Sequence, residues 1–323
     1  STPRPDTAHP ARLEPPQRAP PPSHPQMAAL RRSCCLAALA AFGAEGLRSA
    51  APPAGGQGGG GKRQIKDEPH RHVIAMKEHK LAFCYVQKVA SEHFGPMFNA
   101  VNNISSGGLD PEYSSLHNLG ISWPEVTREN GWKFAMFVRD PLERYLSAFL
   151  SKCLPTGGNK EPVSGGKNCH GPTRSAPVSQ EEKVALFGQR VRTDLASGLP
   201  MDDHWLSQYA VMQRHCGADK FEPAKLDYLG RMTYDLAETN SQVQGLLKLT
   251  SLAGVEALAT QHFPAPSPLA LLQCPGQHCT RSYEDFNTFY KDPETVRLVT
   301  QIFKDDYEKF SLPLPAAAKG QAA

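Results

Sequence analysis

The chain has 323 residues, of which 40% are hydrophobic and 21% charged, and its formal net charge is +3. This composition excludes a fibrous or wholly disordered protein, and a chain of this length can bury a substantial core. It contains no long basic run, which argues against dedicated nucleic-acid binding but leaves room for a local anion pocket.

The first 71 residues divide into three segments of non-globular composition. Residues 1–26 are rich in Pro and are predicted to be disordered. In residues 27–50, Arg31 and Arg32 precede an apolar run, which resembles a secretory signal or a short signal anchor. An Ala-rich low-complexity tail or a transit peptide is the alternative. Residues 51–71 are predicted to be a flexible stem, 72–315 the folded domain and 316–323 a disordered tail.

Two apolar runs in the folded part are each followed by a turn and a helix. Residues 81–86 read as a buried strand, and the pattern changes at Gln87-Lys88 into helical spacing that reaches Val101. Residues 132–138 form the second predicted strand, which is followed by Arg139-Asp140 and a helix starting at Pro141.

The rest of the chain continues this alternation of helices and strands. A helix is expected after Ser179, which forms a capping box with Glu182, and Gly198 ends it. A short strand is expected within 225–232 and a helix over 239–252. The last helix begins at the Asp292 cap and runs to residue 310. The order predicts an α/β domain with a mainly parallel central sheet.

The two turns place cations where open parallel sheets bind ligands, beyond the carboxyl ends of the strands. A helix N-terminus offers free N–H groups to an anion; Lys88 adds a point charge and Arg139 a planar guanidinium. The alternative interpretation is that Arg139 pairs with Asp140 or Glu143 and that Lys88 is simply solvated. The sequence has no GxxxxGK[ST] motif, which disfavours a nucleoside triphosphatase P-loop.

The stretches "CYVQKVAS" and "FVRDPLERYLSAF", in this order and each after a predicted strand, resemble the Golgi carbohydrate sulfotransferases. The similarity is greatest to the branch of chondroitin/dermatan 4-sulfotransferases and HNK-1 sulfotransferases. The later "DDHWLSQYAVMQRHCGADKFEPAKLDYLG" and the C-terminal "IFKDDYEKF" are also similar to that family, so the resemblance covers roughly residues 80–310. It implies a three-layer, P-loop-like α/β fold.

The same resemblance implies the co-substrate 3′-phosphoadenosine 5′-phosphosulfate (PAPS) and the residues that bind it. Lys88, Val89 and Ser91 fall in the loop that holds the 5′-phosphosulfate, and Arg139 and Ser147 fall in the 3′-phosphate site. Sulfuryl transfer needs a neutralised leaving group, and Lys88 is the residue expected to stabilise it.

Three positions depart from the family pattern. Gln87 stands where the family usually has Pro, and Glu92 stands where a Thr hydroxyl is expected. A carboxylate at that position repels an anion by about 1 kcal/mol or more if it is unscreened. Cys216 stands alone where the family often has two cysteines.

His204 is the candidate general base for the acceptor hydroxyl, because histidine titrates near neutral pH. Asp203 is expected to orient it and Trp205 to stack on a sugar ring. The alternative is that His204 is a hydrogen-bonded structural histidine. His93 and His117 are the other candidates for the base.

Six of the eight cysteines lie in the predicted domain, and no CxxC pair or metal-binding pattern occurs among them. Disulfides are therefore expected, and Cys153–Cys169 and Cys274–Cys279 are the pairs suggested by spacing. The sequon at Asn103 agrees with a secreted or luminal glycoprotein.

These observations predict a Golgi PAPS-dependent carbohydrate O-sulfotransferase, membrane-anchored or luminal, with a glycan acceptor and neither metal nor nucleic acid. A first alternative is a catalytically inactive relative that binds glycan or nucleotide as a secreted module, with Glu92 as its mark. A second is a nucleotide-using phosphotransferase, which the missing P-loop motif disfavours.

Overall fold

A computed structural model describes residues 70–104, 111–155, 160–176, 178–264, 280 and 282–321. The predictions for the N-terminal segments and for the Cys274–Cys279 pair lie outside these residues. Within the described ranges, no helix combines the length and the apolar character needed to cross a membrane.

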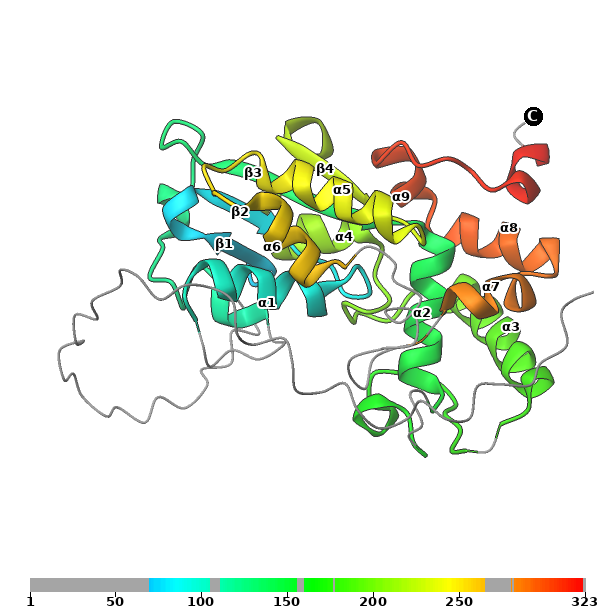
Figure 1. Cartoon of the computed structure of the whole chain (residues 1–323). Helices are drawn as coiled ribbons and strands as arrows, with labels where there is room; N and C mark the ends of the chain where they lie inside the picture. The colour runs from blue at the N-terminus through cyan, green and yellow to red at the C-terminus, as the bar shows by residue number, and fades with distance from the viewer. Residues whose placement is uncertain are drawn as a thin grey trace, which may run out of the picture. The chain divides into compact units, whose positions relative to one another are not determined.

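A four-stranded sheet forms the centre of the domain, in the order β1-β2-β3-β4 (Figure 1). β2 pairs in parallel with β3, and β3 with β4, as the sequence predicts. β1 runs antiparallel to β2 and was not anticipated, because its four residues give too short a pattern. The strands are β1 (Val73–Met76), β2 (Leu81–Cys84), β3 (Lys133–Arg139) and β4 (Tyr228–Met232).

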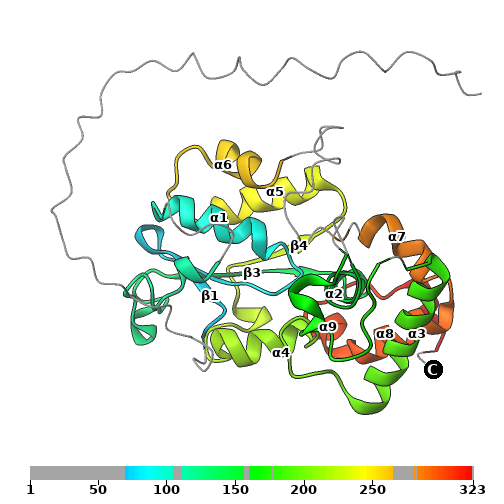
Figure 2. The ribbon, with the colours of Figure 1, turned by 90° about the horizontal axis from the view of Figure 1, so that it is seen from below.

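Helices cover both faces of the sheet and confirm the expected layered α/β fold. Figure 2 shows α1 (Ser91–Val101), α5 (Leu236–Leu247) and α6 (Val255–His262) on one side of the strands, and α4 (Gln208–Met212) on the other. Side chains of β2, β3 and α1 meet in an aromatic core, in which the rings of Phe83 and Phe94 lie 4.6 Å apart and those of Phe94 and Phe137 4.9 Å.

A second group of helices lies beyond the carboxyl end of β3 (Figure 1). Two begin at the caps that the sequence predicts: the Ser179 hydroxyl accepts the Glu182 N–H, and Asp292 accepts the N–H groups of Glu294 and Thr295. The group consists of α2 (Pro141–Cys153), α3 (Gln180–Ser197), α7 (Ser282–Phe289), α8 (Pro293–Ile302) and α9 (Lys304–Lys309).

The predicted C-terminal helix is in fact two helices. It breaks at Phe303, whose φ of −105° and ψ of 27° leave the α region, and α9 starts at the next residue. The break lets α9 turn so that the buried Asp306 accepts the backbone N–H groups of Gln208 and Tyr209 at the start of α4. The helix expected over 239–252 also begins earlier, because Asp235 caps it.

Candidate active site

The turn between β2 and α1 carries the residues predicted to hold a 5′-phosphosulfate. Lys88 and Ala90 both have left-handed backbones, with φ of 66° and 52°. This conformation costs a non-glycine residue about 1 kcal/mol, and such strain is typical of functional sites. Ala90 is also the N-cap of α1 and supplies no side-chain acceptor, so the first turn of the helix, which starts at Ser91, has N–H groups to offer an anion.

The Lys88 ammonium is partly withdrawn from water. Desolvation is the largest cause that lowers its pKa to about 7, and repulsion by the Lys152 ammonium acts in the same direction. The Glu92 carboxylate opposes both effects by raising the pKa. Near neutral pH, Lys88 therefore exchanges its proton, and an arriving anion would favour the charged form. Val89, the next residue, is buried in the core below the turn.

Arg139 ends β3 and makes three side-chain contacts. Its Nε lies 3.2 Å from a carboxylate oxygen of Glu143, and its Nη2 donates to the hydroxyl of Ser282 at 3.0 Å. Its Nη1 donates to the carbonyl of Lys88 at 3.3 Å. The last contact joins the two predicted phosphate-binding turns. Glu143 is one of the two ion-pair partners that the alternative interpretation of Arg139 named.

Glu143 is a titratable residue beside Arg139, so its charge affects any ligand that binds this guanidinium. Burial raises the pKa of its carboxyl to about 7, and the Arg139 guanidinium acts in the opposite direction. At neutral pH the carboxyl is therefore close to half protonated. The guanidinium also lies 5.6 Å from the centre of the Tyr234 ring, which adds a cation–π contact.

The second turn differs from the expectation that both helix N-termini are open to an anion. Asp140 caps α2, and its Oδ1 accepts the N–H groups of Leu142 at 2.9 Å and Glu143 at 3.3 Å. The chain's own carboxylate thus occupies these donors. Anion binding at this turn must depend on side chains, which corrects the prediction for the α2 terminus.

Ser147, the other residue predicted for the 3′-phosphate, lies two turns into α2 and is only 4% exposed. Its hydroxyl is 3.1 Å from the hydroxyl of Thr280. Since Arg139 contacts Ser282, both predicted 3′-phosphate residues touch the stretch that leads into α7. The structure therefore brings Arg139 and Ser147 to one place.

Arg144 fixes the turns relative to each other, a role that the sequence did not reveal. Its side chain is 1% exposed, and it donates to three backbone carbonyls. Its Nε donates to Gln87 at 2.9 Å, Nη1 to Leu206 at 2.7 Å and Nη2 to Asp203 at 2.9 Å. One guanidinium thus ties the residue before Lys88 to the segment that carries His204.

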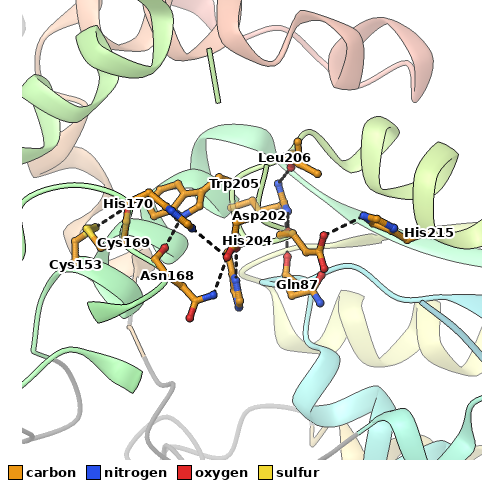
Figure 3. Close-up of polar contacts among 12 residues, drawn as sticks. Gln87, Cys153, Asn168, Cys169, His170, Asp202, His204, Trp205, Leu206 and His215 are labelled. Atoms are coloured by element: carbon orange, nitrogen blue, oxygen red, sulfur yellow. Dashed lines mark hydrogen bonds and ion pairs between the residues drawn. A yellow bond between two sulfur atoms is a disulfide. The ribbon is translucent and has the colours of Figure 1, made fainter. Parts of the chain in front are cut away.

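The carboxylate that orients His204 is Asp202, and the prediction of Asp203 was wrong. Asp202 Oδ1 lies 2.7 Å from His204 Nδ1 and 2.9 Å from its backbone N–H (Figure 3). When Nδ1 donates to the carboxylate, Nε2 is the nitrogen left to accept a proton. Burial is the main cause that lowers the pKa of His204, so the imidazole is neutral at pH 7 and able to act as a base.

A loop from elsewhere in the chain holds Asp202 in turn. Asn168 donates to its Oδ2 at 2.7 Å, and His170 Nε2 lies 3.2 Å from the same atom (Figure 3). The predicted disulfide between Cys153 and Cys169 is present and anchors this loop to the end of α2. The hydrogen bonds of His204 and Asn168 outweigh burial and hold the pKa of the Asp202 carboxyl well below its usual range.

Asp203 serves a different cluster on the other side of the His204 segment. Its carboxylate lies 2.6 Å from Arg71 Nη2 and 3.1 Å from Nε2 of both His72 and His215. A second disulfide, Cys84–Cys216, lies beside this cluster, since Cys216 Sγ contacts the His72 carbonyl. The sequence analysis assigned no partner to either of these cysteines.

Trp205 is a core residue, which corrects its predicted role in sugar stacking. It is fully buried, its indole N–H donates to the Asn168 carbonyl at 2.6 Å, and the Arg190 guanidinium lies 3.7 Å from its ring centre. Its N–H has a hydrogen-bond partner and its ring is packed inside the protein, so no ring face is left for a ligand.

The side chains of the other two histidine candidates have different surroundings, although His93 belongs to the first turn of α1. His93 Nδ1 lies 2.8 Å from the His262 carbonyl, and its ring packs on Phe263 beside α6. His117 is exposed in the loop whose Ser115 forms a bridge with Ile74 of β1. His204 lies close enough to Lys88 for the lysine charge to contribute to its lowered pKa.

Lys152, near the end of α2, is a buried cation that the sequence analysis missed. It is 4% exposed, and its charge acts on both Lys88 and His204. No local signal marks it: all residues of α2 except Glu143 are buried, and distant parts of the chain supply that cover. Within the described ranges, no group of three or more His, Cys, Asp or Glu is arranged to hold a metal ion.

The fold and this arrangement of side chains belong to a known class. A model of the sulfotransferase family matches residues 71–313, about three quarters of the chain. The chain belongs to the sulfotransferase family, whose members transfer a sulfuryl group to an acceptor. Neither the curated proteins nor the solved structures contain a significant match to the chain.

Proposed function

We propose that this protein is a PAPS-dependent O-sulfotransferase that acts on a carbohydrate hydroxyl. The observation that carries the proposal is the contact between the Arg139 guanidinium and the Lys88 carbonyl, which holds two cationic turns together at the carboxyl edge of the sheet. A nucleotide with one anionic group at the 5′ position and another at the 3′ position of its ribose suits two neighbouring cationic turns.

The side chains present fit the two ends of PAPS. The uncapped first turn of α1, from Ser91, and the Lys88 ammonium suit the 5′-phosphosulfate. The Arg139 guanidinium and the Ser147 hydroxyl suit the 3′-phosphate. PAPS supplies the activated sulfuryl group, and the protein supplies position and charge.

His204 acts as the general base. Asp202 fixes its Nδ1, burial keeps the ring neutral, and Nε2 takes the proton of the acceptor hydroxyl. Lys88 stabilises the negative charge that develops on the leaving phosphate, and its pKa of about 7 allows it to be recharged as that charge appears.

The proposals of a glycan acceptor and of the Golgi lumen are supported by less direct features. The second motif, from Arg139 to Ser147, resembles the chondroitin/dermatan 4-sulfotransferase and HNK-1 branch. Two disulfides among the described residues agree with an oxidising compartment. An N-terminal membrane anchor within residues 27–50 belongs to the same proposal.

Thermal melting with adenosine 3′,5′-bisphosphate, the desulfated product, tests the nucleotide site. At a hundredfold excess over its dissociation constant, the ligand should add about 2.7 kcal/mol to the free energy of unfolding. Arg139→Ala should lose this shift while melting as a folded protein. A wild-type protein that melts cooperatively and does not respond would overturn the proposal. With the site established, unsulfated chondroitin and dermatan become the acceptors to assay with PAPS.

A nucleotide- or glycan-binding relative without catalysis is the second candidate, and the position of Glu92 favours it. The Glu92 carboxylate, in the first turn of α1, raises the pKa of both Lys88 and Lys152, so it shares their electrostatic space. This candidate predicts bisphosphate binding with no sulfuryl transfer, and transfer that appears in Glu92→Thr. Transfer by the wild-type protein would exclude it.

A further inference from the structure

Lys152 is a buried lysine for which no partner occurs among the residues that the structure describes. It is 4% exposed, and its ammonium has no hydrogen bond or ion pair to any residue that the structure describes. Two other buried cations have partners: Arg144 donates to three carbonyls, and Arg190 Nε lies 2.6 Å from Asp194, although Arg190 Nη2 has no partner in the described part of the chain. A buried lysine side chain without a protein partner is costly, so this position favours an anionic ligand.

The stretch of α2 that includes Lys152 is tied to the 5′ turn and to the segment of the candidate base. Arg144, two turns earlier on the helix, is bonded to the residue before Lys88 and to the segment of His204. The residue after Lys152 is Cys153, whose disulfide holds the loop that orients Asp202. Both ends of this helical stretch are therefore tied to the catalytic segments.

The charged groups that interact with Lys152 also indicate that it lies near Lys88 and His204. Burial lowers the pKa of Lys152, while the carboxylates of Asp202 and Glu92 raise it. Its ammonium is in turn the strongest charge acting on Lys88 and also lowers the pKa of His204. Two ammonium groups that repel each other in a partly dry site are both stabilised in the charged form when an anion lies between them.

We propose that the Lys152 ammonium binds the sulfuryl oxygens of the donor during transfer, opposite Lys88 and beside His204. This inference rests on the proposed function. In the step, the bond between sulfur and the bridging oxygen breaks while sulfur bonds to the acceptor oxygen. His204 takes the acceptor proton, and the bond electrons leave with the 5′-phosphate, near Lys88. Lys152 holds the three equatorial oxygens of sulfur, where charge remains throughout.

The test compares two ligands that differ only in the sulfuryl group. Dissociation constants of PAPS and of adenosine 3′,5′-bisphosphate are measured by calorimetry for wild type, Lys152→Met and Lys152→Gln. Loss of a charge-assisted contact should weaken PAPS binding at least tenfold in both variants, and bisphosphate binding less than threefold. Lys304→Met, which removes an exposed lysine of α9 and the same unit of charge, should change neither constant.

Each outcome decides between the claims. A wild type that binds neither ligand overturns the proposed function itself. Equal losses for both ligands place Lys152 on the 5′-phosphate or in the structure, and unchanged binding of both removes it from the site; either result overturns this inference and leaves the function standing. Without ligand, the Lys152→Met protein should melt at the wild-type temperature or above. Replacing a lysine that stabilises the fold would lower the melting temperature, whereas replacing a buried lysine without a partner would not.

Discussion

The two strand–turn–helix units of this domain, β2–α1 and β3–α2, have the same order of elements but differ in helix capping and in the partners of their cations. Each places a cation at the carboxyl end of a parallel strand. In the first unit the helix is uncapped, two residues are left-handed and the lysine pKa is lowered to about 7. In the second, Asp140 caps the helix and Arg139 contacts Glu143, Ser282 and Lys88.

The difference separates two kinds of anion site. The first turn has no side-chain cap, so a ligand can bind its N–H groups without displacing a capping side chain. The second turn is already satisfied internally, so a ligand there must displace Glu143 or share Arg139 with it. Under the proposed function, the first unit stabilises the reacting charge, and the second supplies affinity and orientation. The following substitutions test that division.

The largest expected effect is on turnover. Lys88→Met should lower kcat about a thousandfold, equivalent to about 4 kcal/mol, because no neutral side chain can stabilise the leaving phosphate. Bisphosphate affinity should fall much less, about tenfold, since Arg139 and Ser147 remain. Turnover with PAPS and titration with the bisphosphate measure the two effects. A loss of affinity as large as the loss of kcat would refute the division between the units.

Arg144→Met should have the largest effect on stability. It leaves the carbonyls of Gln87, Asp203 and Leu206 without their donor, and we expect a loss of about 3 kcal/mol in the free energy of unfolding. Urea unfolding followed by fluorescence measures it. Arg174→Met, at an exposed arginine, is the control and should leave the transition almost unchanged. A wild-type-like transition in Arg144→Met would show that the two units are held together by other contacts.

The pH dependence of affinity should expose the competition at Arg139. The Glu143 pKa is raised to about 7, so the carboxyl is mostly neutral at pH 6 and mostly charged at pH 8. Glu143→Gln should therefore bind the bisphosphate about tenfold more tightly than wild type at pH 8 and about equally at pH 6. Comparing the two proteins at each pH cancels the titration of the ligand. Weaker binding by the variant at both values would mean that Glu143 orients Arg139 and does not compete.

The smallest expected effects are on the free energy of unfolding, from changes to the helix cap of α2 and to the left-handed backbone before α1. Asp140→Ala removes a helix cap and should cost about 1 kcal/mol of stability. Ala90→Gly relieves a left-handed backbone at the uncapped helix and should gain up to about 1 kcal/mol. Thermal melting of the two variants should thus show shifts of opposite sign. Shifts of the same sign would show that the two termini are equivalent in the free protein.

Local chemistry explains which parts of the structure the sequence could predict. Asp292-Pro293 and the Ser179–Glu182 pair act within one turn, so their helices start where expected. Parallel strands follow from buried runs separated by helices. The break at Phe303 was missed because it depends on Asp306 reaching the N-terminus of α4, almost a hundred residues away in sequence.

The site was predictable to the same extent. Motif residues such as Lys88 and Arg139 follow strands, so their positions at the carboxyl edge of the sheet can be predicted from the order of strands and helices. The choice between Asp202 and Asp203 is also local, because an aspartate caps the N–H two residues later, as Asp202 does for His204. The roles of Arg144 and Lys152 were not accessible, since they depend on which distant carbonyls and charges α2 passes.

The two disulfides are nested, and this arrangement affects how the protein must be made. The Cys153–Cys169 pair lies within the segment closed by Cys84–Cys216, a separation of 132 residues. A ring of that size removes much of the freedom of the unfolded chain, worth about 5 kcal/mol in the chain-entropy description. The ring also contains both turns, Lys152 and His204. Protein produced in a reducing cytosol would lack this bond, and oxidative refolding or a secreting host is the appropriate source for every assay above.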